Sequence, residues 1–255
     1  MRFHKYSSTG NDFILFDQTA IFPMELPSTD WIKKTCQRRV SVGADGLILV
    51  KKTSENSVRM TYFNSDGNEV EMCGNGLRAV GRFCHEVLKI SSNNEIKVDT
   101  MNSSYQVLVP NYLNIKIKMT EIDSSNKQLA QKYDASYLSV GVPHVVKEVE
   151  SLSSFPIDLA LEIRQDSIFE AGTNVNFYQE LENDLLRVRT FERGVEAETL
   201  SCGTGVTATA VSYMRKRNSH KVVIKTEGGQ LVVSRVGEDF YLEGPSELVF
   251  IGELF

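Results

Sequence analysis

Two stretches of the chain repeat one pattern. The first reads Glu69-Val-Glu-Met-Cys73-Gly-Asn-Gly-Leu-Arg-Ala79, and the second reads Glu198-Thr-Leu-Ser-Cys202-Gly-Thr-Gly-Val-Thr-Ala208. Glutamate, cysteine, both glycines and alanine occupy matching positions in the two copies. The copies stand about half a chain apart, whereas solenoid repeats recur every 20–50 residues or so. The sequence therefore predicts two related α/β halves facing each other.

Each copy is expected to open a helix. After Gly76, apolar residues such as Leu77 and Val80 recur at helical spacing. The segment from Gly203 to Met214 contains no charged residue, and a helix that is apolar on every side is typical of a buried one. A further helix is expected after Ser28, whose hydroxyl can cap a helix N-terminus.

Short strand-like runs, bounded by turn residues, surround these helices. Examples of such runs are residues 13–16, 47–51, 185–191 and 222–225. The stretch 121–136 is polar, which indicates the boundary between the two halves. We therefore expect a first half over residues 1–119, with 246–255 returning to it, and a second half over residues 120–245.

The overall composition excludes several classes of protein. The 255 residues are 41% hydrophobic, and 33 acidic against 28 basic side chains give a net charge of −5. No basic run suggests a nucleic-acid partner, and no apolar run approaches the roughly 20 residues that span a bilayer. The polar segment Met1–Asp12 lacks the apolar core of a secretory signal. We expect a cytoplasmic protein without nucleic-acid or membrane partners.

The cysteines divide into two kinds. None of Cys36, Cys73, Cys84 and Cys202 forms a CxxC pair, and no zinc-finger spacing is present. Structural disulfides are rare in a reducing cytoplasm. Cys36 and Cys84 fall on apparent apolar helix faces and are expected to be buried packing residues. The repeated pair sits among glycines, where the backbone is open to a ligand, and is expected to be chemical.

The paired glycines could instead bind phosphate. Both copies match the relaxed dinucleotide fingerprint GxGxxG/A. That fingerprint should directly follow an apolar strand, but polar turns precede both copies here. A GxxxxGK[ST] loop is absent from the sequence. Phosphate binding is therefore the less favoured interpretation.

A cysteine at a helix N-terminus suits proton transfer. The positive end of the helix dipole lowers the pKa of a thiol from about 8.5 toward neutrality, and the free N–H groups bind a carboxylate. Two such helix ends at one cleft could remove a proton from one face of a carbon and deliver one to the other. The expected substrate is an α-amino acid. No pyridoxal-phosphate lysine or metal cluster is recognisable, so we expect chemistry without cofactor or metal.

These motifs resemble the diaminopimelate epimerase family, cofactor-independent enzymes of lysine and peptidoglycan biosynthesis. The matching segments, in family order, are Thr9-Gly-Asn-Asp-Phe13, Gly43-Ala-Asp-Gly46, Phe63-Asn-Ser-Asp-Gly67, Met72-Cys-Gly-Asn-Gly76, Gly141-Val-Pro-His144, Thr173-Asn174, Phe191-Glu-Arg-Gly194 and Cys202-Gly-Thr-Gly205. The resemblance implies an α/β (α+β) fold of two pseudo-symmetric domains, each a curved, mostly antiparallel sheet wrapped around a central helix. It implies an isomerase that interconverts LL- and meso-2,6-diaminopimelate by two-base proton transfer.

The resemblance also implies roles for single residues. It makes Cys73 and Cys202 the acid–base pair, supported or tuned by His144 and Glu192. The residues implied to hold the reacting α-carboxylate are Gly74, Asn75, Gly203 and Thr204. Those implied to hold the amine and the distal end of the substrate are Asn11, Asn64, Asn174, Glu192 and Arg193. Taken singly, Asn64 would be a turn residue and His144 a structural histidine.

Two alternatives stay open at this point. A racemase of another amino acid, of the histidine or hydroxyproline type, could use the same scaffold. Arg193 and three asparagines suit a second charged amino-acid end better than a ring. A non-catalytic binding protein would not need two thiols at mirrored positions. The expected partners are a small amino-acid substrate and, as an alternative to a monomer, a second copy in a homodimer.

Overall fold

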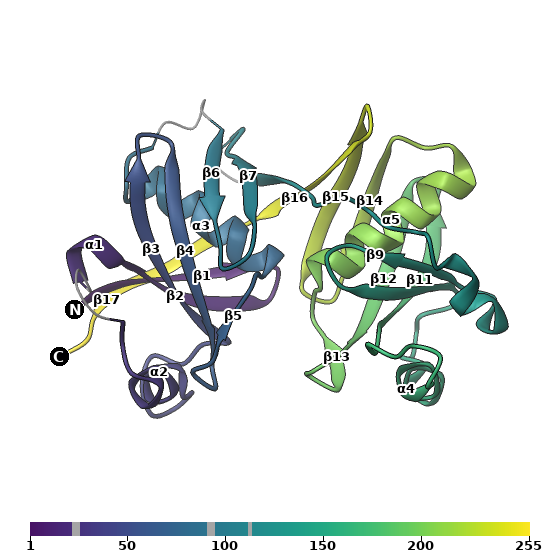
Figure 1. Ribbon diagram of the computed structural model, residues 1–255, viewed down its shortest axis with the longest axis horizontal. Helices are drawn as coiled ribbons and strands as arrows, with labels where there is room; N and C mark the ends of the chain where they lie inside the picture. Colours follow the sequence, from purple (N-terminus) through teal and green to yellow (C-terminus); the bar gives the residue numbers. More distant parts are fainter. Residues whose placement is uncertain (22–25, 91–94, 112–113) are drawn as a thin grey trace. The chain divides into compact units, whose positions relative to one another are not determined.

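The chain folds into two compact units, each an α+β structure (Figure 1). The computed structural model describes residues 1–21, 26–90, 95–111 and 114–255. The first unit is Met1–Ile117 with Gly244–Phe255, and the second is Lys118–Glu243. The expected fold class is confirmed. The polar stretch 121–136 lies within the second unit and includes the 3-10 helix η1 (Lys127–Tyr133).

The sheet of the first unit is mostly antiparallel. Its strands are β1 (Arg2–Ser8), β2 (Asn11–Asp17), β3 (Gly46–Ser54), β4 (Ser57–Asn64), β5 (Glu69–Val70), β6 (Ile96–Asp99), β7 (Ser104–Leu108), β8 (Asn114–Lys118) and β17 (Glu247–Glu253). β2 pairs in parallel with β3, and β4 with β6. The other pairs, β17–β1, β1–β2, β3–β4, β4–β5, β6–β7 and β7–β8, are antiparallel.

The second unit repeats this order of pairings. Its strands are β9 (Ser136–Ser139), β10 (Pro143–Glu148), β11 (Asn174–Glu182), β12 (Leu185–Glu192), β13 (Ala197–Thr199), β14 (Lys221–Thr226), β15 (Gly229–Val236) and β16 (Asp239–Pro245). β10 pairs in parallel with β11, and β12 with β14. The pairs β9–β10, β11–β12, β12–β13, β14–β15 and β15–β16 are antiparallel. β1 to β8 thus correspond one by one to β9 to β16.

Each parallel pair needs a crossover, and helices occur in these crossovers. In the first unit they are α2 (Thr29–Cys36) and α3 (Gly74–Glu86), and in the second α4 (Ile157–Gln165) and α5 (Gly203–Arg217). A short helix, α1 (Gln18–Ile21), follows β2. Ser28 caps α2 as expected, because its Oγ accepts a hydrogen bond from the Trp31 N–H at 3.3 Å. The sequence analysis missed the helices α1 and α4 and the strands β1, β5, β11, β13 and β17.

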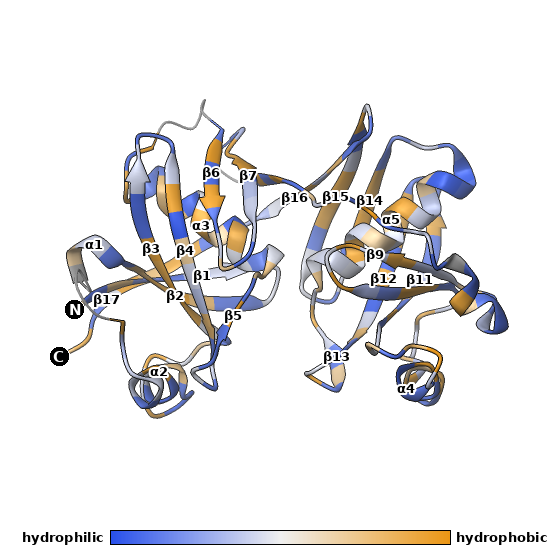
Figure 2. Ribbon diagram, viewed as in Figure 1, coloured by the Kyte–Doolittle hydropathy of each residue, from blue (hydrophilic) through white to orange (hydrophobic). Residues whose placement is uncertain are grey.

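The two central helices pack against strands of their own units, and helices and strands alike carry hydrophobic residues (Figure 2). α3 packs against β1, β2 and β7, and all its residues from Gly74 to Cys84 are buried. A Cβ added at Gly81 would lie 2.7 Å from Val107 Cγ1, so glycine lets the helix approach the sheet closely. The buried helix expected after Gly203 is confirmed, and its exposed last turn carries basic residues, which are favourable at a helix C-terminus. No helix among the described residues is long and apolar enough to cross a membrane.

Candidate active site

Both repeated cysteines occupy the residue just before a central helix. Cys73 is the N-cap of α3 and Cys202 the N-cap of α5, each with extended backbone angles and no capping hydrogen bond from its own side chain. The first N–H groups of a helix lack intrahelical partners. Each thiol therefore lies at the positive end of a buried helix. Cys202 is only 7% exposed, which differs from the open position expected for it, and Cys73 is half-buried.

A set of amides surrounds Cys73. Its thiol donates to Asn11 Oδ1 at 3.6 Å, and the same oxygen accepts from Asn75 Nδ2 at 3.3 Å. Asn11 Nδ2 donates to Asp45 Oδ2 at 2.7 Å, which fixes the orientation of the Asn11 amide. The structure thus brings together three of the residues that the sequence singled out. Asn64 ends β4, where its carbonyl accepts from the Gly67 N–H in a turn.

Arg78 stands behind these amides and was not expected to take part. Its side chain is fully buried, and its Nη2 donates to Asn75 Oδ1 at 2.9 Å and to Thr9 Oγ1 at 2.7 Å. Its Nε donates to the Pro245 carbonyl at 3.3 Å. Burial lowers the pKa of Arg78 to about 10, so the group remains a cation at neutral pH. A charge inside the apolar helix was the sequence signal that could have identified it.

Cys202 has a different set of neighbours. Its sulfur lies 3.5 Å from Thr204 Oγ1. Glu192, at the end of β12, is partly buried, and burial raises the pKa of its carboxyl, while a hydrogen bond from Cys202 opposes that shift. The two residues therefore interact through a hydrogen bond in which the thiol is the donor.

His144 and Asn176 form a buried pair in the same unit. His144 lies on β10 and is 0% exposed; burial, with a contribution from the charge of Arg193, lowers its pKa to about 3. Asn176 lies on the adjacent β11, with its Nδ2 3.1 Å from His144 Nδ1. Sequence analysis missed Asn176, because a buried amide in a strand has no local signature. Its partners come from other strands.

The side chains of Asn174 and Arg193 form hydrogen bonds with backbone groups of the protein. Asn174 Nδ2 donates to the Pro143 carbonyl at 3.1 Å, and its Oδ1 accepts from the Arg193 backbone N–H at 2.8 Å. The guanidinium of Arg193 donates to the carbonyl of Ala171. Asn174 thus connects β10 to the end of β12.

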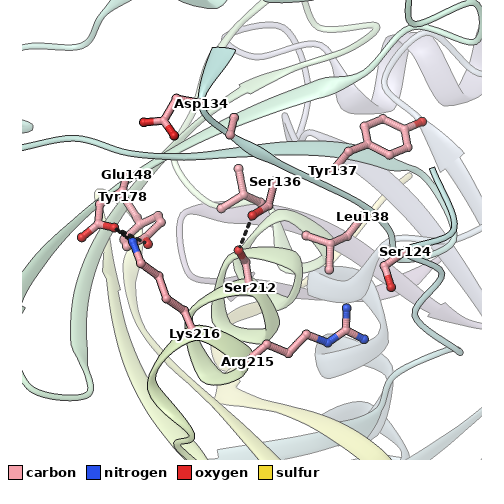
Figure 3. A pocket seen from close by; sticks show the side chains of 12 residues that line it. Ser124, Asp134, Ser136, Tyr137, Leu138, Glu148, Tyr178, Ser212, Arg215 and Lys216 are labelled. Atoms are coloured by element: carbon pink, nitrogen blue, oxygen red, sulfur yellow. Dashed lines mark hydrogen bonds and ion pairs between the residues drawn. The ribbon is translucent and has the colours of Figure 1, made fainter. Parts of the chain in front are cut away.

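A separate cavity lies on the second unit (Figure 3). It has a volume of about 540 Å³, and its lining includes Tyr137, Glu148, Tyr178, Arg215 and Lys216. None of the predicted site residues lines it. Among the described residues, no three His, Cys, Asp or Glu side chains are placed to hold a metal ion.

Comparison with known proteins points to one family. The sequence model of the family described as "Diaminopimelate epimerase" matches residues 3–121 and 136–249. A diaminopimelate epimerase from Flavobacterium psychrophilum is 37% identical over 98% of both chains, and one from Methanocella arvoryzae is 36% identical over 100% of this chain and 96% of its own. A crystal structure of a PhzF-family phenazine biosynthesis protein from Bacillus anthracis superimposes with a TM-score of 0.72, at 14% identity, over 100% of this chain and 99% of that one.

Proposed function

The chain belongs to the diaminopimelate epimerase family, and on that premise we propose that Cys73 and Cys202 are the acid–base pair of its reaction. The chain is an isomerase that interconverts LL- and meso-2,6-diaminopimelate, a small amino-acid substrate, in lysine biosynthesis. Inverting one α-carbon requires a proton to leave from one face and another to arrive at the opposite face. Two groups in mirrored positions can do this without moving across the substrate.

The observation that carries this proposal is the shared place of the two thiols. Each is the N-cap of the central helix of its unit, and the two units repeat the same order of strand pairings. A helix N-terminus favours an anion by its dipole and its free N–H groups. It therefore supports both a thiolate and the negative charge that grows on the substrate as the α-proton leaves.

The remaining site residues complete the proposal. The residues proposed to hold the reacting carboxylate through helix-end donors are Gly74, Asn75, Gly203 and Thr204. Those proposed to hold the amine and the distal end of the substrate are Asn11, Asn64, Asn174, Glu192 and Arg193. Arg193 would have to exchange its Ala171 carbonyl for a substrate carboxylate, with which guanidinium forms a stronger, charge-assisted bond. His144 is proposed to support Cys202 through Asn176, which contacts His144 and lies next to the loop of Cys202.

The decisive experiment follows the hydrogen at the inverted carbon. Purified protein is incubated with LL-diaminopimelate in deuterated water, and the stereoisomers are separated and weighed by mass spectrometry at early times. Two bases predict deuterium in the first meso product and almost none in the remaining substrate. Deuterium entering substrate and product equally fast would contradict a two-base reaction. Absence of any interconversion would contradict the function itself.

We also propose a cytoplasmic location and a homodimer. A catalytic thiol must stay reduced, which the cytoplasm ensures. β17 pairs, among the described strands, with β1 alone, and its Val249, Phe250 and Ile251 are 57%, 45% and 45% exposed. An apolar edge strand is a surface on which a second copy can pair. Analytical ultracentrifugation of the wild type against a Phe250→Lys variant tests this; a wild type that sediments as a monomer contradicts it.

A further inference from the structure

The amide of Asn176 has its orientation fixed by its surroundings. One side of the amide lies 3.0 Å from the Val145 carbonyl oxygen, and the other lies 2.9 Å from Thr190 Oγ1. A backbone carbonyl only accepts hydrogen bonds, so the atom facing it is the donor, Nδ2. The Oδ1 atom then accepts from the Thr190 hydroxyl. Asn176 is 0% exposed, so water does not replace either partner.

This orientation determines which ring nitrogen of His144 carries hydrogen. The same Nδ2 lies 3.1 Å from His144 Nδ1. An NH₂ group only donates, so Nδ1 must accept with its lone pair, and a neutral ring then carries its hydrogen on Nε2. Protonating Nδ1 would place two N–H groups against each other in a fully buried site. Burial and the charge of Arg193 act in the same direction, because both lower the pKa of His144.

The Nε2–H group of the ring is a buried hydrogen-bond donor without an acceptor among the described residues. Among the described residues, His144 Nε2 has no hydrogen-bond partner although it is shielded from solvent. An unpaired buried donor costs free energy, so such groups call for an explanation. A neutral N–H group that is held in one orientation can stabilise negative charge without giving up its proton.

Asn176 also connects this pair to the loop of Cys202. A Cβ added at Gly205 would lie 2.2 Å from Asn176 Oδ1 and 3.4 Å from Cys202 Sγ. The amide and the thiol therefore flank the same glycine of the repeated motif. Asn176, which sets the hydrogen on His144, thus lies in the immediate surroundings of the proposed acid–base residue Cys202.

We propose that Asn176 is a positioning residue that fixes His144 as a neutral Nε2–H donor, so that His144 stabilises negative charge beside Cys202 and exchanges no proton during the reaction. The contribution to catalysis rests on the proposed function of Cys202. The tautomer itself does not, because it follows from hydrogen bonds within one unit. This refines the role implied for His144, since a fixed donor cannot act as the base that receives the thiol proton.

The charged groups near His144 do not oppose this assignment. β10 packs against β9, β11 and α5. The charged residues of these four elements, all of them away from His144 in the strand register or in the last turn of α5, are Lys147, Glu148, Glu180, Glu182, Arg215, Lys216 and Arg217. Glu192 and Arg193 lie at the end of β12. Arg193 is the charged group that acts on the pKa of His144.

Nuclear magnetic resonance of the wild-type protein tests the proposal directly. Protein labelled with ¹⁵N in its histidines is recorded from pH 5.5 to 8.5, and the His144 signals are assigned by their loss in His144→Gln. We expect the nitrogen shifts of a neutral Nε2–H ring, unchanged across this range. A hydrogen on Nδ1, or a ring that titrates within the range, would overturn the proposal.

Asn176→Asp tests the cause. A carboxylate accepts where the amide donated, so the hydrogen of His144 should move to Nδ1 and the ring should begin to titrate in the measured range. We expect kcat to fall about tenfold near pH 7 with KM little changed, and the pH profile to gain a new inflection. A variant that keeps the Nε2–H pattern and the wild-type profile would show that Asn176 does not set the tautomer.

The matched control is Gln179→Glu. Gln179 lies on the same strand, and its Oε1 accepts from the Leu152 N–H at 3.0 Å, an interaction that a carboxylate retains. The same chemical change should leave the His144 signals and kcat as in the wild type. Should Asn176→Asp fail to fold, the wild-type spectrum still decides the tautomer. Loss of the Nε2–H pattern with normal epimerisation refutes only this inference, whereas the pattern without epimerisation refutes only the proposed function.

Discussion

The loops of Cys73 and Cys202 have the same backbone arrangement at a helix N-terminus, but different charged side chains lie next to them. Behind Cys73 lies the buried cation Arg78, and the matching position in the second unit is Thr207, whose Oγ1 donates to the Gly203 carbonyl at 2.9 Å. Beside Cys202 lies the partly buried carboxyl of Glu192. A buried cation favours a thiolate nearby, and a buried carboxylate disfavours one. Both copies of the repeat thus place a cysteine at a helix N-terminus, but the electrostatic environments of the two thiols differ.

The largest expected effect is a loss of kcat that should be similar when either repeated cysteine is replaced. Cys73→Ala and Cys202→Ala should each lower kcat by about 10²-fold or more, the effect of one positioned acid–base group. Cys36→Ala and Cys84→Ala serve as controls, because both thiols are buried packing residues and the pKa of each is raised by burial. Steady-state assays of the four variants check this. Similar losses in all four would mean that packing had been mistaken for chemistry.

The next effect separates the loops. Arg78→Met removes the cation and the donors that hold Asn75 and Thr9, so kcat/KM should fall about tenfold or more. Thr207→Val, at the matching position, removes only a bond to the helix backbone and should change kcat/KM less than threefold or so. Kinetic assays beside thermal melts check this pair. Equal losses of kcat/KM in the two variants would contradict the proposed difference between the two loops.

Glycine at the matching helix positions sharpens the comparison in terms of stability. An alanine Cβ at position 205 would lie 2.2 Å from Asn176 Oδ1, an atom held by Thr190. At position 76 it would lie 3.1 Å from Met60 Cε, the end of a flexible side chain. Gly205→Ala should therefore lower the free energy of unfolding by about 1–3 kcal/mol and Gly76→Ala by less. Urea denaturation measures both, and the reverse order would contradict the packing described.

The smallest effect is a pH dependence. Because burial raises the pKa of Glu192 above its unfolded value, the folded protein binds a proton that the unfolded chain has released. Its contribution to stability is present at low pH and is lost as pH rises through the folded pKa. Glu192→Gln stays neutral, so its Tm relative to wild type should be higher at pH 8 than at pH 4. A difference independent of pH would show that Glu192 ionises at no cost.

The repeated cysteine motif was enough to predict both central helices and the two related halves. It could do so because glycine, alanine and apolar spacing are local properties of a helix start. The contacts of Arg78 and Asn176 could not be predicted, since their partners Thr9, Pro245 and Val145 are distant in sequence. The strand β1 was missed for another reason. Its polar sequence hides Lys5, whose charge is paired with Asp12 on β2 at 2.8 Å.

The pairing of β1 with β17 has a consequence for synthesis on the ribosome. Arg2 faces Glu253 across these strands, so the first unit combines two segments, Met1–Ile117 and Gly244–Phe255. The second unit is one continuous segment, Lys118–Glu243. Domains fold as units while the chain emerges from its N-terminal end. The second unit can therefore finish folding before the first, whose sheet lacks the strand that pairs with β1 until β17 has emerged from the ribosome.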